Sequence, residues 1–261
     1  MIFVGRGALL RRAVAHALAT GHRVDLVVSE DPDDRPHDRA ADGRAVPFTA
    51  TTDVNAVADR LLGHATDGVV WSVNNRLIFR EPLLGRGLRI HNIHNGLLPQ
   101  HRGLPSAAVA YALLNGDREY GATLHEVDAG VDTGRVLAEL PFPLAADARF
   151  HRVLLRGIQA CQQLFERSLD AVAAGRPIGP PAAREPRPAG YHSLRALREL
   201  PSYAGHPAYR RATDVGVAAP FVPELVEVLR AAAGADPGYG GGLRTAGRTI
   251  DGSSHNGVTD G

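Results

Sequence analysis

The sequence predicts an α/β protein built around a mostly parallel sheet. The chain opens with a strand-length apolar run at 2–5, a glycine turn, a helical pattern at 8–20 and a second apolar run at 24–29, which is a βαβ arrangement. Short apolar runs and helical patterns then alternate as far as residue 174. Polar residues collect where several predicted strands end, and open α/β sheets carry their sites at strand ends.

The individual elements follow from two periodicities. The predicted strands are continuous apolar runs, as at 68–73 (GVVWSV), or alternate apolar and polar residues, as at 120–127 (YGATLHEV). The predicted helices repeat apolar residues three and four apart, most clearly at 150–174. Cys161 lies in that apolar stripe and is expected to be a core thiol, not a nucleophile. In order, strands are expected at 2–5, 24–29, 46–49, 67–73, 88–93, 120–127 and 136–144, and helices at 8–20, 53–64, 106–115 and 150–174.

Composition divides the chain into three parts. Residues 1–176 carry the alternating elements and form the predicted main domain. Residues 177–190 (PIGPPAAREPRPAG) contain five prolines and 191–233 hold two short helical patterns, so 177–233 is expected to be a linker with a small appendage. The appendage would pack on the main domain or on a second copy, which makes a homodimer one option. Residues 234–261 are rich in Gly, Ser and Asp and are expected to be a disordered tail.

The composition also excludes several classes of function. A net charge of +1 argues against a general nucleic-acid binder. All 29 basic residues are arginine, which rules out Schiff-base chemistry, pyridoxal phosphate attachment and a P-loop, because each needs a lysine. The single cysteine allows no internal disulfide, and no run approaches the ~18 apolar residues of a membrane span. Since the N-terminus lacks a secretory signal pattern, the protein is expected in the cytoplasm.

Residues 88–105 (LRIHNIHNGLLPQHRGLP) are the stretch around which we predict a site. Asn92 and His94 stand two apart on a predicted strand, so their side chains are expected on the same face. Pro99 and Pro105 then impose a loop, because proline lacks the backbone donor and disfavours helix at the preceding residue. An amide and an imidazole at a strand's exit into a stiff loop indicate a functional site.

A second polar loop, Asp128 to Gly134, follows the strand at 120–127. Its Asp132 is expected near His94, where a carboxylate can orient the imidazole and support proton removal. The Asn92 amide and the His94 imidazole can both donate hydrogen bonds to the oxygen of a tetrahedral intermediate. No serine or cysteine adjoins the histidine in sequence as a nucleophile, so we predict transfer of an acyl-level carbon to a nucleophile carried by a second substrate.

Two alternatives compete with this site. His91, His94, His101 and His125 fall in one region and could bind a metal, but no pair has zincin spacing and no cysteine pair assists. The turn Gly5-Arg6-Gly7 resembles the start of a dinucleotide-binding motif, as in a nicotinamide-dependent oxidoreductase, but it lacks the third glycine. A tight strand-to-helix turn explains that pattern more simply.

The motifs and their order resemble one family. Asn92-Ile93-His94 is followed by Leu97-Leu98-Pro99, Arg102-Gly103, Gly121-Ala122-Thr123-Leu124-His125, and Val131-Asp132-Thr133-Gly134. This combination resembles the 10-formyltetrahydrofolate-dependent formyltransferases, which include methionyl-tRNA formyltransferase, glycinamide ribonucleotide formyltransferase and sugar N-formyltransferases. The resemblance covers about residues 65–145, with weaker agreement back to residue 1. It implies that 1–176 is a Rossmann-like formyltransferase catalytic domain.

The resemblance also implies 10-formyltetrahydrofolate as the formyl donor and gives roles to the site residues. Asn92 and His94 would stabilise the oxyanion, and Asp132 would support proton removal from the attacking amine. At Asn95-Gly96 the chain departs from the family, where a small residue and a serine are more usual, and this is expected to change a substrate-side hydrogen bond. The folate would contact one loop at Asn75, Arg76, Leu77 and Ile78, a second loop at Ala129, Gly130 and Val131, and an apolar wall at Leu97 and Leu98.

The expected acceptor is a primary amine on a small molecule, either an amino sugar linked to a nucleotide or an amine of a specialised-metabolite pathway. Residues beyond 177 lack the size and the wide basic face of a tRNA-binding domain, so methionyl-tRNA formylation is a less favoured alternative. A formyltetrahydrofolate hydrolase, with water as acceptor, is another alternative within the family. A non-catalytic folate or nucleotide binder would keep the fold without the chemistry.

Overall fold

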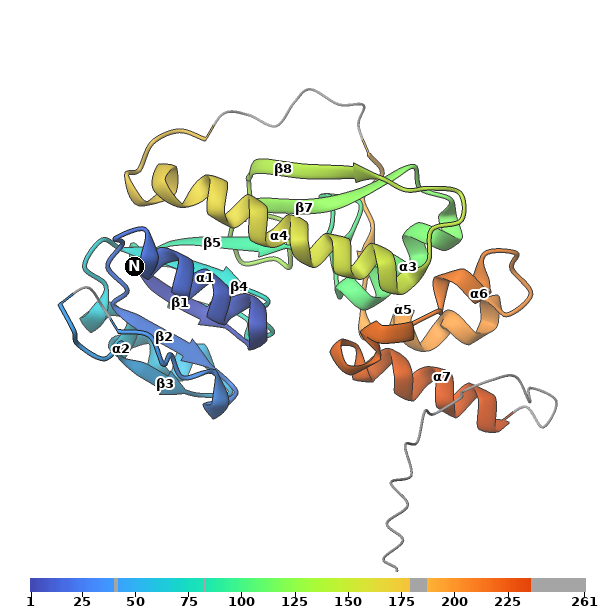
Figure 1. Cartoon of the computed structure of the whole chain (residues 1–261), viewed down its shortest axis with the longest axis horizontal. Coiled ribbons are helices and arrows are strands. Elements are labelled where there is room, and N and C mark those ends of the chain that lie inside the picture. Colours follow the sequence, from blue (N-terminus) through green and yellow to red (C-terminus); the bar gives the residue numbers. More distant parts are fainter. Residues whose placement is uncertain (40–41, 82, 179–186, 236–261) are drawn as a thin grey trace, which may run out of the picture.

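The computed structural model describes residues 1–39, 42–81, 83–178 and 187–235, which form a seven-stranded sheet with helices on both faces (Figure 1). The strand order is β3-β2-β1-β4-β5-β7-β8. The strands from β3 to β5 pair in parallel, whereas β7 is antiparallel to β5 and β8 to β7, so the prediction of a mostly parallel sheet is confirmed. The strands are β1 (Ile2–Gly5), β2 (Leu26–Ser29), β3 (Phe48–Ala50), β4 (Val69–Val73), β5 (Arg89–His94), β7 (Glu119–Glu126) and β8 (Val136–Pro143).

Two apolar layers cover the sheet, because successive strand residues point to opposite faces. Phe3 and Trp71 belong to the larger layer, which includes the apolar sides of α1, α3 and α4. Val4 and Val70 belong to the smaller layer, which lies under α2. Cys161 on α4 is buried, and burial raises the pKa of its thiol to about 12, which confirms the core assignment. The covering elements are α1 (Gly7–Ala19), η1 (Pro32–Asp34), η2 (Val54–Val57), α2 (Ala58–His64), α3 (Pro105–Asn115) and α4 (Phe150–Ala173).

The C-terminal segment packs on the main domain, largely against α3 (Figure 1). Its first strand, β9 (Tyr191–His192), pairs in parallel with the short β6 (Arg102–Gly103). Leu197 and Leu225 are buried in the same apolar cluster as the larger layer of the sheet, so the appendage shares the core of the main domain. The boundary at residue 176 and the homodimer stay predictions. The segment continues through α5 (Leu194–Glu199), η3 (Leu200–Tyr203), α6 (Tyr209–Ala212), η4 (Gly216–Phe221) and α7 (Pro223–Ala235).

Arg187 fixes the start of this segment to the sheet. Its guanidinium lies 2.8 Å from Glu119 Oε1 and 3.0 Å from Glu139 Oε1, on neighbouring strands β7 and β8. Burial would lower the pKa of Arg187, but the two carboxylates outweigh it and raise the pKa further. The C-terminal chain is therefore anchored by a partly buried ion cluster before it reaches β9.

Several boundaries differ from the predictions. The second strand begins at Leu26 because Asp25 turns inward, where its carboxylate accepts hydrogen bonds from the Met1 ammonium group (2.7 Å) and the Thr66 hydroxyl (2.7 Å). The predicted helix at 53–64 is a 3-10 turn followed by a shorter α-helix. The predicted tail lies outside the described residues from 236 onward. Within the described ranges, no helix is long and apolar enough to cross a membrane.

Candidate active site

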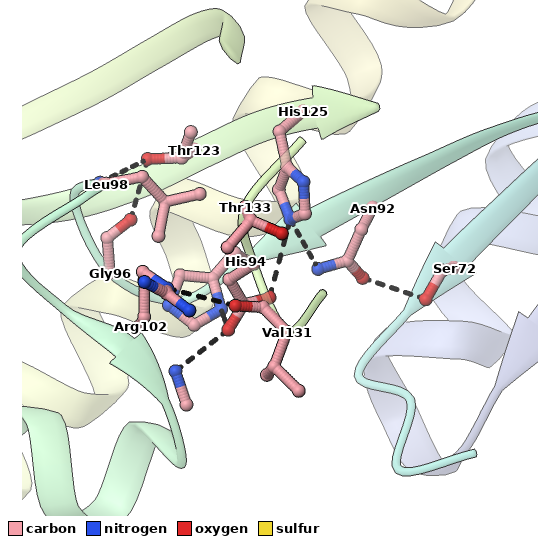
Figure 2. Close-up of polar contacts among 12 residues, drawn as sticks. Ser72, Asn92, His94, Gly96, Leu98, Arg102, Thr123, His125, Val131 and Thr133 are labelled. Carbon is pink, nitrogen blue, oxygen red and sulfur yellow. Dashed lines mark hydrogen bonds and ion pairs between the residues drawn. The ribbon is translucent and has the colours of Figure 1, made fainter. Parts of the chain in front are cut away.

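Asn92, His94 and Asp132 are brought together around the end of β5. Figure 2 shows the side chains of Asn92 and His94 at this place, together with His125. Asp132 comes from the loop between β7 and β8, and its Oδ2 lies 3.5 Å from His94 Nδ1. Two hydrogen bonds hold the loop over the site. Arg102 Nε donates to the carbonyl of the residue before Asp132 (3.0 Å), and the Gly103 N–H donates to Asp132 Oδ2 (2.8 Å).

Asp132 is held as an anion. Its backbone has φ 52°, in the left-handed region that Asp and Asn tolerate better than most residues, and its side chain is 11% exposed. Burial alone would raise its pKa, but the neighbouring His94 and the Gly103 N–H outweigh burial and hold the pKa well below its usual range. A carboxylate with such a low pKa stabilises a neighbouring positive charge better than it retains a proton itself.

His94 is buried and its ring orientation is set by the backbone. Nε2 lies 2.6 Å from the His101 carbonyl oxygen, and because a carbonyl only accepts, Nε2 carries a proton. Nδ1 is then the nitrogen that faces Asp132. Burial lowers the pKa of His94, although Asp132 and the His101 carbonyl oppose this effect. The ring therefore offers Nδ1 as a proton acceptor beside a carboxylate that would stabilise the resulting imidazolium.

His125 is a further member of the site. In the sequence it appeared in a family motif and in the metal alternative, but it was not predicted as a site residue. It lies on β7 directly opposite Asn92 in the strand register. Its Nε2 is 3.0 Å from Asn92 Nδ2 and 3.5 Å from Asp132 Oδ1. Alternation along 120–127 places His125 on one face of a strand, but only the pairing of β7 with β5 reveals that this face contains the site.

The four histidines of the metal alternative do not converge. The His91 ring lies against Trp71, with ring centroids 5.7 Å apart. His101 has Nε2 3.0 Å from Asp117 Oδ2, so it supports His94 through its carbonyl instead of joining the site with its ring. In the part of the chain that the structure describes, no group of three or more His, Cys, Asp or Glu is arranged to hold a metal ion.

The loop after β4, predicted to contact folate, is shaped by Asn75. Its Oδ1 accepts the Leu77 N–H and its Nδ2 donates to the Leu77 carbonyl, both at 2.9 Å. Arg76 reaches α7, where it lies 3.2 Å from Glu224 Oε2. The Ile78 side chain is 49% exposed, so the loop presents an apolar surface on a fixed backbone.

The second predicted folate loop is also open to solvent. Ala129 and Gly130 are exposed, and the Val131 side chain is 37% exposed. Leu97 is fully buried and Leu98 almost so, and their role as an apolar wall for folate stays a prediction. A Cβ on Gly121 would come within 2.8 Å of Leu97 Cδ2, so Leu97 packs inward. Ile78 and Val131 add exposed apolar surface on the two loops.

Gly96 is buried and the partly buried Asn95 packs against α4, so the expected change in a substrate-side hydrogen bond stays a prediction. Asn95 Oδ1 is buried with no hydrogen-bond partner among the described residues, and a Cβ on Gly157 of α4 would lie 2.1 Å from it. A Cβ on Gly96 would lie 2.7 Å from His94 Nε2 and 2.8 Å from His101 Cβ. The lack of a side chain at Gly96 therefore lets the imidazole reach the His101 carbonyl.

The glycine turn at 5–7 is occupied by one of the chain's own carboxylates. The Gly7 N–H, at the start of α1, donates to Asp34 Oδ2 (2.7 Å), and Asp34 also accepts from Ser29 Oγ (2.9 Å) and pairs with Arg11. A helix N-terminus is where a dinucleotide phosphate would bind, and here a buried carboxylate takes that place. A Cβ on Gly5 would lie 1.9 Å from the Val73 carbonyl oxygen, so packing alone requires that glycine. The structure favours the tight-turn explanation over the oxidoreductase alternative.

Comparison with known proteins identifies the family. Residues 5–167 match the formyl transferase family. The methionyl-tRNA formyltransferase of Clavibacter michiganensis subsp. michiganensis is 29% identical over 196 residues, which span 71% of this chain. The matched region covers 64% of the Clavibacter protein, which is less than two thirds of its length.

Two solved structures share the fold. A sugar N-formyltransferase from Shewanella has a TM-score of 0.60 at 18% identity, covering 76% of this chain and 78% of that one. The N-formyltransferase from Helicobacter canadensis, in complex with folinic acid and dTDP-3-aminofucose, has a TM-score of 0.57 at 15% identity, covering 75% of this chain and 71% of that one. Since the family match spans more than half of the chain and includes Asn92, His94 and Asp132, this chain belongs to the formyl transferase family.

Proposed function

We propose that this chain transfers a formyl group from 10-formyltetrahydrofolate to the primary amine of a small-molecule acceptor. The observation that carries the proposal is the arrangement around Asp132, where an amide donor and the Nδ1 of a buried imidazole gather beside a carboxylate. The nearby Ser72 is buried and its hydroxyl donates to Asn92, so nucleophilic attack falls to the acceptor.

Each group has a defined task in this proposal. The bound donor supplies a formyl carbon, which exchanges its bond to the folate nitrogen for a bond to the acceptor amine. The Asn92 amide donates to the formyl oxygen as negative charge develops there. His94 accepts the amine proton at Nδ1 and would return it to the folate nitrogen as the bond from that nitrogen to the formyl carbon breaks. Asp132, 3.5 Å away, stabilises the imidazolium, whose positive charge also favours the oxyanion.

Two observations support folate as the donor. Ile78 and Val131 expose large apolar side chains on the two predicted folate loops, and a flat aromatic ring system needs such surfaces. The Helicobacter canadensis relative, which has the same fold, was solved in complex with folinic acid. Asn75, Arg76 and Leu77 would hold the pteridine side through the loop backbone that Asn75 stabilises.

The surroundings of Arg102 support a small acceptor that carries a ring or an anionic group. The Arg102 side chain bonds the Val131 carbonyl and lies over the Tyr191 ring, 5.7 Å from its centroid, and Tyr191 is 55% exposed. An exposed aromatic ring beside a guanidinium suits a nucleotide-linked amino sugar, through stacking and charge. The Helicobacter canadensis relative was solved with such a compound, dTDP-3-aminofucose.

Methionyl-tRNA is the second candidate acceptor, because the similar Clavibacter protein is a methionyl-tRNA formyltransferase by name. The C-terminal segment offers little support for it. Arg211 donates to the Leu113 carbonyl (3.2 Å), which ties one basic residue of this segment to α3. We place the enzyme in the cytoplasm, where its folate donor and either acceptor would be available.

An assay of tetrahydrofolate release tests the proposal. The protein is incubated with 10-formyltetrahydrofolate and with dTDP-amino sugars, other primary amines or methionyl-tRNA. Release that requires an amine, together with the formylated amine in the products, supports the transferase. Release of formate without any amine would identify the hydrolase instead. Saturable nicotinamide binding with no release from any mixture would refute formyl transfer.

A further inference from the structure

The Asn92 amide is held at both ends by residues outside the Asn-His-Asp set (Figure 2). Ser72 Oγ donates to Asn92 Oδ1 at 2.8 Å, and Asn92 Nδ2 lies 3.0 Å from His125 Nε2. Ser72 is the register partner of Asn92 on β4, and His125 is its partner on β7. The amide is therefore bonded across three adjacent strands, and a planar group with both ends bonded cannot turn freely.

The direction of these hydrogen bonds is set at His125. Its Nδ1 lies 2.7 Å from the Glu126 carbonyl oxygen, which only accepts, so Nδ1 carries the ring proton. In the neutral ring Nε2 is then an acceptor, and the Asn92 Nδ2 group is the donor that it requires. Asn92 Oδ1 must consequently face Ser72. Asn75 Nδ2 in turn donates to Ser72 Oγ at 3.2 Å, which completes a chain of hydrogen bonds in one direction.

We propose that Ser72 is a positioning residue for formyl transfer, which acts by aiming the Asn92 amide at the formyl oxygen. One Nδ2 hydrogen of Asn92 is committed to His125, and across the described ranges the other has no protein acceptor, so it is free to bind substrate. Asn75 lies in the predicted folate loop, so the same chain couples the donor-binding loop to the oxyanion donor. The inference rests on the proposed function, because the role of Asn92 belongs to that proposal.

The burial of Ser72 makes its hydroxyl difficult to replace. Ser72 is 3% exposed, so water cannot easily take the place of Oγ in a Ser72→Ala variant. Asn92 Oδ1 would lose this donor, and the amide would spend part of its time turned away from the substrate. A misplacement of about 1 Å in a catalytic group costs ~10² in rate. We therefore expect kcat to fall by ~10–10² while KM changes by less than about threefold.

Steady-state kinetics of five variants test the proposal. Ser72→Thr keeps the hydroxyl and should restore kcat to within about threefold of wild type. Ser168→Ala removes an equally buried serine from α4 and should leave kcat unchanged. In the Asn92→Ala background, adding Ser72→Ala should cause no further loss of kcat, because Ser72 affects the chemical step through the Asn92 amide. Asn75, which also donates to Ser72, keeps both of its hydrogen bonds to Leu77 in this variant. Equal kcat in Ser72→Ala and wild type, or losses that multiply in the double variant, would overturn the proposal.

A second measurement is independent of activity. Nitrogen-15 NMR follows hydrogen exchange and rotation of the Asn92 side-chain amide, which should be slow in the wild type and faster in Ser72→Ala. Unchanged amide exchange in Ser72→Ala overturns the positioning role. If the wild type formylates none of the amines, the proposed function fails by itself, and the exchange measurement still decides whether Ser72 orients Asn92.

Discussion

Replacing Asp132 by asparagine tests the core of the proposed chemistry with the least structural disturbance. Asparagine has the same shape and also tolerates the left-handed backbone that Asp132 adopts (φ 52°). Its Oδ1 can still accept the Gly103 N–H that now bonds Asp132 at 2.8 Å. The substitution therefore removes the negative charge while it keeps the loop contact, so a loss of activity would report on electrostatics.

The magnitude follows from the distances. At the 3.5 Å between Asp132 Oδ2 and His94 Nδ1, a carboxylate and an imidazolium attract by about 5 kcal/mol at an effective dielectric constant of 20. Acid–base assistance by one group typically contributes ~10²–10⁴ in rate, which corresponds to about 3–5 kcal/mol. Both estimates predict that kcat of Asp132→Asn falls by ~10²–10⁴. Binding of folate should persist, because the loop remains in place.

The assay compares amine-dependent tetrahydrofolate release and folate affinity in Asp132→Asn and in Asp128→Asn. Asp128 lies in the same loop, and its Oδ1 accepts from the Gly130 N–H (3.0 Å) and the Thr133 hydroxyl (2.6 Å), which an asparagine Oδ1 can replace. The control should therefore retain the wild-type kcat to within about twofold. If Asp132→Asn is as active as the control, the carboxylate does not stabilise His94 during turnover and the reasoning fails.

Three further predictions concern stability. Burial holds the pKa of His91 below its usual 6.5, so at acidic pH the folded state binds fewer protons than the unfolded state. The urea midpoint of unfolding should therefore fall as the pH drops below 6.5, and it should fall less steeply in His91→Gln. Equal pH dependence of the urea midpoint in the two proteins would contradict this prediction. Gly157→Ala should destabilise the protein by about 1–3 kcal/mol in thermal unfolding, although alanine has the better helix propensity, because the new Cβ would lie 2.1 Å from Asn95 Oδ1. Gly63→Ala is the control: its Cβ would have no atom within 4 Å, so it should stabilise by ~0.5–1 kcal/mol. Stabilisation by both substitutions would refute the packing argument. Arg187→Ala should cost about 2 kcal/mol in urea unfolding, because it removes the charge-assisted hydrogen bonds that the guanidinium donates to Glu119 and Glu139. An unchanged urea midpoint would show that the ion cluster contributes nothing to stability.

The sequence by itself determined the α/β class, most of the strands and the shared face of Asn92 and His94. These features depend on periodicity within a few residues, and strand geometry alone places side chains two apart on one face. The order of the motifs also indicated the formyl transferase family, which residues 5–167 match. Burial of Cys161 was predictable for the same local reason, because it lies in a helical apolar stripe.

The tertiary structure decided which distant residues meet. The antiparallel pairing of β7 with β5 places His125 opposite Asn92, and strand periodicity contains no information about which strand is the neighbour or how it runs. Leu97 turns inward because β7 offers it Gly121, and Asn95 packs on α4 because Gly157 leaves room. The contacts that complete the site join residues many positions apart, so three-dimensional packing, and not local sequence, sets their geometry.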